Sequence, residues 1–109
     1  MPSVSLSDPI GPLQLRVMNH LWQVESGTVQ DVADAVNAQG GTKLAYTTYL
    51  TVMRNLTKRG MLDQRKTTTK RQQFVVLVDE FTYKSHVLKA LYRDYCDNNP
   101  AQLKRYLNA

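Results

Sequence analysis

Small hydroxyl side chains and cations gather on one face of a helix predicted at residues 47–59. On a helical wheel at about 100° per residue this face has no acid, whereas an ordinary solvated face usually mixes glutamate with lysine. A short hydroxyl lets a backbone approach a phosphate closely, and a threonine methyl packs on the thymine C5-methyl group. We therefore predict a helix that lies in the major groove of double-stranded DNA. Its predicted contact residues are Thr47, Thr48, Thr51, Arg54, Asn55 and Lys58.

Arg54 and Asn55 are the members of this face whose side chains are long enough to reach base edges. A surface arginine on a helix often pairs with an acid three or four positions away, but residues 50, 51, 57 and 58 are not acidic. Base contact is therefore the favoured role of Arg54 over a surface ion pair. The alternative for the threonines is a solvated surface that contacts nothing.

Positive charge is concentrated in residues 43–71. This segment has eight basic residues and one acid, Asp63, which gives a net charge of +7, whereas the rest of the chain carries six basic and eight acidic residues. A local positive field indicates a polyanionic partner for one face, and the alternative is a solvated basic surface. The cations beyond the helix are predicted to contact DNA phosphates. They are Arg65, Lys66, Lys70 and Arg71.

The residues that usually build catalytic or metal sites are sparse. Cys96 is the single cysteine, so a disulfide scaffold, a thiolate zinc site and an iron–sulfur site are not expected. His20 and His86 have no acid or cysteine at metal-ligand spacing, and the serines lack a recognisable partner constellation. P-loop and GxGxxG motifs are absent. We therefore predict no enzyme activity, no catalytic residues, no metal and no cofactor, and we expect Cys96 to be a small buried hydrophobe.

The chain gives no signal for a membrane location. No apolar run approaches the roughly 20 residues that span a bilayer. The first residues, MPSVSLSDPIGPL, lack the basic and apolar regions of a signal peptide. A cytoplasmic protein without membrane insertion is expected.

Three helices and a hairpin are predicted to position the basic face. Helical periodicity marks residues 11–23, 29–38 and 47–59, and β-rich runs mark 62–66 and 73–78. The intervening TTTK is predicted to form the hairpin tip. Two helices, a basic third helix and a basic hairpin follow one another in the order of a winged helix-turn-helix. The fold class is therefore mainly α with a small β-hairpin.

Two further amphipathic helices are predicted after Asp79, at about 80–96 and 100–107. We place the DNA-binding domain at residues 1–79 and a helical dimerisation segment at 80–109. The winged-helix core has limited free surface to cover the apolar stripes of these helices, so pairing with a second copy is favoured over folding back on the same chain. The predicted dimer residues are Val87, Leu88, Leu91, Tyr92, Tyr95, Leu103, Tyr106 and Leu107.

Several stretches of the chain resemble the penicillinase-repressor family of bacterial winged-helix repressors. They are GPLQLRVMNHLW, TVQDVADAV, LAYTTYLTVMRNLTKRGML and the basic hairpin that follows. The resemblance runs continuously over about residues 10–78. Copper-responsive relatives carry a C-terminal cysteine cluster that this chain lacks.

The resemblance implies a homodimeric repressor that binds a pseudo-palindromic operator. It matches the family's recognition helix to Thr47, Thr48, Thr51, Arg54 and Asn55, and it implies a short first strand around Leu44–Ala45. It also suggests an upstream sensor-protease as a partner, although no matching cleavage site is identifiable. The alternative from a different class is a winged helix that binds an acidic protein and has no DNA specificity of its own.

Overall fold

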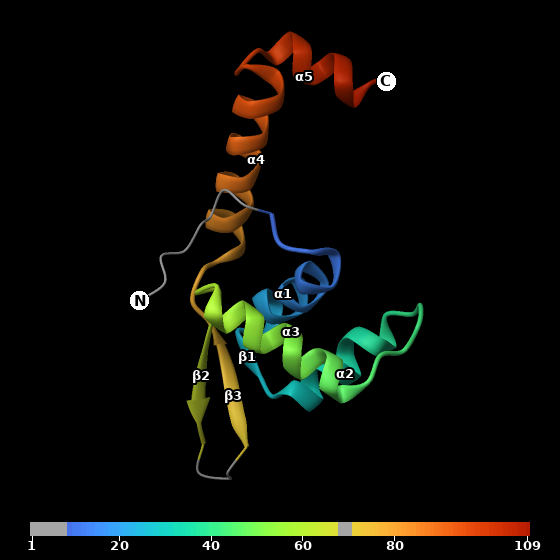
Figure 1. Ribbon diagram of the computed structural model, residues 1–109, viewed down its shortest axis with the longest axis vertical. Helices are drawn as coiled ribbons and strands as arrows, with labels where there is room; N and C mark the ends of the chain where they lie inside the picture. The colour runs from blue at the N-terminus through green and yellow to red at the C-terminus, as the bar shows by residue number, and fades with distance from the viewer. Residues whose placement is uncertain (1–8, 68–70) are drawn as a thin grey trace.

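The described part of the chain contains five α-helices and three short β-strands (Figure 1). A computed structural model describes residues 9–67 and 71–109. The five helices and the small sheet confirm the predicted fold class. The elements are α1 (Pro12–Val24), β1 (Ser26–Gly27), α2 (Val29–Ala38), α3 (Tyr46–Lys58), β2 (Leu62–Lys66), β3 (Gln72–Val76), α4 (Glu80–Cys96) and α5 (Pro100–Leu107).

Local hydrogen bonds fix the ends of the helices around the predicted DNA-binding face. At the start of α2, the Thr28 hydroxyl accepts the Asp31 N–H at 3.1 Å and Asp31 accepts the Thr28 N–H at 3.2 Å, which is a capping box. At the end of α3, Gly60 adopts a φ of +86°. The Met61 N–H then donates to the Leu56 carbonyl at 2.9 Å, as in a Schellman motif. The chain thus reverses directly from α3 into the hairpin.

The sheet has β3 at its centre, with β1 and β2 paired antiparallel on either side. Ser26 pairs with Val75, and Leu62 pairs with Val76. The second hairpin strand spans residues 72–76 rather than the predicted 73–78, because Asp79 already caps α4. The hairpin β2–β3 is the wing of the fold.

The strand expected around Leu44–Ala45 is wrong, because the edge strand of the sheet is β1. Leu44 instead bonds to the Asn37 side chain at the end of α2. Its N–H donates to Asn37 Oδ1 at 3.1 Å, and its carbonyl accepts from Asn37 Nδ2 at 3.0 Å. These bonds satisfy the backbone groups that a strand partner would otherwise satisfy. Ala45 is extended only because it is the N-cap of α3.

The core lies between α1, α2, α3 and the sheet, and the first two turns of α4 complete it. Val87, which the apolar stripe predicts to face a second copy, is instead 9% exposed and belongs to this core with Tyr83. The C-terminal part of α4 rises away from the core, and α5 crosses its far end (Figure 1). The fully buried members are Val17, Met18, Leu21, Val32, Val36, Tyr49, Met53, Leu56, Met61, Leu62 and Phe74.

Candidate nucleic-acid interface

One face of α3 anchors the helix in the core and leaves the other face to solvent. Tyr49, Met53 and Leu56 are completely buried. The Tyr49 hydroxyl donates to Asn37 Oδ1 at 2.7 Å, which ties α3 to the end of α2. A helix anchored along its whole length in this way has a fixed rotation about its axis. The side chains opposite this anchor therefore always point outward.

The outward face of α3 carries the residues predicted to contact DNA. Thr47, Thr51, Arg54, Asn55 and Lys58 are exposed, and Thr48 is half-buried. The Thr51 hydroxyl donates to the Thr47 carbonyl at 3.1 Å, so its methyl group and its oxygen lone pairs stay available. Within residues 9–67 and 71–109, the side chains of Arg54 and Asn55 make no hydrogen bond or ion pair. Both are therefore free to bind an external ligand.

The wing places further cations beside this face. Lys66 and Arg71 are exposed, and the Thr67 hydroxyl donates to the Arg71 carbonyl at 2.7 Å to close the hairpin. Arg65 donates from Nε to Asp63 at 3.1 Å. This ion pair is exposed and contributes little to stability, so Arg65 can exchange Asp63 for another anion at a small cost in free energy. The predicted contact Lys70 lies outside the described residues. The described part of the wing thus carries three cations, and the one ion pair described for them is the exposed pair of Arg65 with Asp63.

A hollow of about 510 Å³ lies between the wing and the starts of α2 and α3. Arg54 enters it from α3 and Arg71 enters it from the wing. It also contains Gln30, Tyr46 and Gln72, which the helical wheel of residues 47–59 did not indicate. Gln30 and Tyr46 belong to the first turns of two different helices, and the packing of α2 against α3 brings them together. The hollow thus combines two cations with neutral polar and apolar side chains, and it lies beside the outward face of α3.

Seven of the eight predicted dimer residues, all except Val87, form a second surface at the other end of the molecule. An open groove of about 730 Å³ runs between α4 and α5, and we call it the α4–α5 groove. Leu88, Tyr95 and Leu107 are 64%, 72% and 74% exposed. Cys96 is 3% exposed beneath the groove, which confirms the prediction of a buried thiol. The groove is lined by Leu88, Leu91, Tyr92, Tyr95, Cys96, Leu103, Tyr106 and Leu107.

The described residues hold neither a metal-ligand cluster nor a candidate membrane span. Among residues 9–67 and 71–109, no three histidine, cysteine or acidic side chains come together as metal ligands. None of the helices in these ranges is both long and apolar enough to cross a bilayer.

Comparison with protein families finds a match along almost the whole chain. The penicillinase repressor family model matches residues 10–107. Transcriptional regulator BlaI from two strains of Mycobacterium tuberculosis, CDC 1551 and H37Rv, is 41% identical over 56 residues. The aligned part is 50% of this chain and 39% of those relatives, so the chain matches about two fifths of their length.

Solved structures share the fold at low sequence identity. The solution structure of the DNA binding domain of the repressor BlaI has a TM-score of 0.61 and 22% identity, and the match covers 76% of this chain and 94% of that one. The structure of the hsRosR-S4 complex has a TM-score of 0.63 and 10% identity, and the match covers 95% and 89%. Both support the winged-helix architecture.

Proposed function

Because the chain belongs to the penicillinase repressor family, we propose that it represses transcription by binding double-stranded operator DNA as a homodimer. The observation that carries the proposal is the acid-free outward face of α3. This face combines exposed hydroxyls with Arg54 and Asn55, which make no bond within the described protein. The function is binding, and no step of it requires a catalytic residue, a metal or a cofactor.

In the proposed complex, α3 lies in the major groove. Arg54 reads a guanine through its O6 and N7 atoms, and Asn55 reads an adjacent base edge. The threonines Thr47, Thr48 and Thr51 allow close approach to the backbone and to thymine methyl groups. Lys58, in the last turn, contacts a phosphate.

The wing and the hollow bind the DNA backbone beside the major groove that α3 occupies. Arg65, Lys66, Lys70 and Arg71 neutralise phosphates there, which gives affinity and register rather than sequence preference. The hollow suits a phosphate, because the Tyr46 hydroxyl adds a neutral donor to the cationic charge of Arg54 and Arg71.

The α4–α5 groove supplies the proposed dimer contact. Large apolar side chains that are exposed together, as Leu88, Tyr95 and Leu107 are, often mark a protein–protein contact. Pairing two copies through a two-fold axis buries both grooves and presents two α3 helices to successive major grooves, about 34 Å apart or a multiple of that. The operator is then pseudo-palindromic. We retain residues 1–79 as the DNA-binding domain and residues 80–109 as the dimerisation segment.

The family resemblance also supports an upstream sensor-protease as a partner that relieves repression. The rival proposal is a winged helix that binds an acidic protein through α3. The two differ in how binding responds to salt, because only DNA releases condensed counterions.

The experiment is selection of bound duplexes from a random pool, followed by fluorescence anisotropy of the selected duplex and a scrambled duplex over a range of salt concentrations. We expect enrichment of a palindrome and a log-linear loss of affinity, with a slope of about −0.9 per phosphate neutralised. A shallow salt dependence without palindrome preference would favour the protein-binding alternative.

A further inference from the structure

We propose that the contacts where α4 leaves the core form a clamp that sets the direction of α4, and thereby the half-site spacing that the dimer accepts. This inference rests on the proposed DNA-binding function. We call these contacts the α4 clamp, and its members are Ile10, Trp22, Val78, Tyr83 and Lys84.

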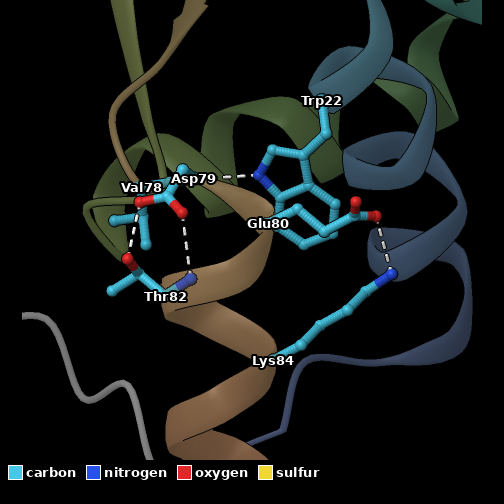
Figure 2. A network of polar contacts seen from close by, with 6 residues as sticks. All are labelled: Trp22, Val78, Asp79, Glu80, Thr82 and Lys84. Carbon is cyan, nitrogen blue, oxygen red and sulfur yellow. Dashed lines mark hydrogen bonds and ion pairs between the residues drawn. The ribbon is translucent and has the colours of Figure 1, made fainter.

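The first part of the clamp is the Trp22 side chain at the end of α1. Its indole N–H donates to the Val78 carbonyl at 2.8 Å, which joins residues 56 positions apart (Figure 2). Val78 lies between β3 and α4, outside the regular hydrogen bonds of either element. Trp22 therefore holds the connecting segment at Val78, next to Leu77, whose N–H donates to the Met61 carbonyl at 3.0 Å.

The second part of the clamp holds the first turns of α4. The Tyr83 hydroxyl accepts the Ile10 N–H at 2.8 Å, and Tyr83 is only 4% exposed. Its ring centroid is 5.7 Å from that of Trp22. The Lys84 ammonium lies 5.3 Å from the centre of the Trp22 ring and pairs with Glu80 at 2.8 Å. Trp22 thus contacts α4 on one side and the connecting segment on the other.

The helix start is also locked from within. Asp79 accepts the Thr82 N–H at 3.0 Å and the Thr82 hydroxyl at 2.6 Å (Figure 2). The peptide bond between Val78 and Asp79 is therefore fixed on both sides. Trp22 binds the Val78 carbonyl, and the Asp79 side chain caps the first turn of α4. A junction fixed on both sides has little freedom to act as a hinge.

The direction of α4 matters because the helix is a lever. It has 17 residues. At about 1.5 Å per residue, a rotation of roughly 10° at its base moves its far end by about 4 Å. One base pair adds about 3.4 Å between half-sites and about 35° of rotation. A free rotation of roughly 10° at the base of α4 is therefore enough to absorb the distance that one base pair adds, so the dimer can distinguish such spacings only if α4 is held more tightly than this.

The test compares three substitutions that each remove one hydrogen bond. Trp22→Phe and Tyr83→Phe remove the two polar contacts of the clamp while retaining an aromatic ring. Tyr49→Phe is the matched control, because it removes a tyrosine hydroxyl bond inside the DNA-binding domain, away from α4. Thermal unfolding of all three variants identifies any general loss of stability.

The first measurement is a spin-label distance in the full chain without DNA. Labels are attached to Asp34→Cys on α2 and Asp94→Cys on α4 in a Cys96→Ser background, and the labelled protein is diluted with unlabelled protein. Both labelled positions are exposed. We expect a narrow distance distribution for the parent and the Tyr49→Phe control. The two clamp variants should broaden or shift it by roughly 4 Å, the displacement derived from the helix length.

The second measurement uses the duplex selected by the parent protein, with versions that have one base pair more or one fewer between half-sites, and a single half-site. We expect the parent to prefer the selected spacing by roughly tenfold, and the clamp variants to prefer it by about threefold or less, with half-site affinity unchanged. Unchanged distances together with unchanged spacing preference overturn the clamp. If the parent itself shows no palindrome preference, the proposed function fails instead, and the label distances alone decide the clamp.

Discussion

Replacing Arg54 by alanine should weaken operator binding and relax the preference at one base position of each half-site. In the free protein Arg54 is exposed and makes no hydrogen bond or ion pair with a described residue. Its removal should therefore change the free energy of unfolding by about 0.5 kcal/mol or less. The measured effect then belongs to the DNA contact alone.

The size of that effect follows from one bidentate contact per half-site. Such a contact contributes about 1–3 kcal/mol of discrimination, which is roughly 5- to 150-fold in the dissociation constant. A dimer makes the contact twice, so a full operator should lose about 2–6 kcal/mol if the half-sites act independently.

The assay is competition anisotropy with duplexes that carry each single base-pair change in one half-site. Arg93→Ala is the control, because Arg93 is also an exposed arginine but lies on α4 beside Asp94. We expect Arg54→Ala to bind all four base pairs equally at one position and to discriminate normally elsewhere. Equal affinity of Arg54→Ala and parent protein for the operator and for random duplex would refute the recognition assignment.

Three other perturbations test the wing, the dimer and the base of α4. Arg71→Ala should weaken operator and scrambled duplex about equally and reduce the salt slope by about 1, as measured by anisotropy at several salt concentrations. Leu88→Asp should give a folded monomer in analytical ultracentrifugation with non-cooperative operator binding; a dimer that persists would disprove the groove assignment. Hydrogen bonds from the Thr82 side chain and backbone lower the pKa of Asp79 below its ordinary value of 3.8. Asp79→Ala should therefore lower the melting temperature at neutral pH, and the difference from the parent should vanish as pH falls through that lowered pKa.

The sequence predicts the elements that depend on local pattern. The helical period of residues 47–59 is strong enough to give α3 and to separate Tyr49, Met53 and Leu56 from the basic face. Gly60 marks the end of the helix, because a left-handed residue there is most easily a glycine. These features need no knowledge of distant residues.

The sequence did not predict features that depend on contacts between residues far apart in the chain. The two residues of β1 are a strand only because Ser26 pairs with Val75, and two residues carry no period of their own. Val87 and Leu88 are both apolar neighbours on α4, so hydrophobicity alone could not show that Val87 faces the core and Leu88 faces the groove. Gln30 and Tyr46 meet at the hollow only after the helices have packed.

The hydrogen bonds of the Asn37 side chain fix the position of α3, whatever the length of the turn that precedes it. One amide receives or donates three hydrogen bonds, two with the Leu44 backbone and one with Tyr49. The start of α3 is thus fixed to the end of α2 across the turn. Gly40 and Gly41 within the turn have open space around them, and both adopt positive φ angles. We therefore expect that residues or a reporter group inserted between Gly40 and Gly41 leave the orientation of α3 unchanged.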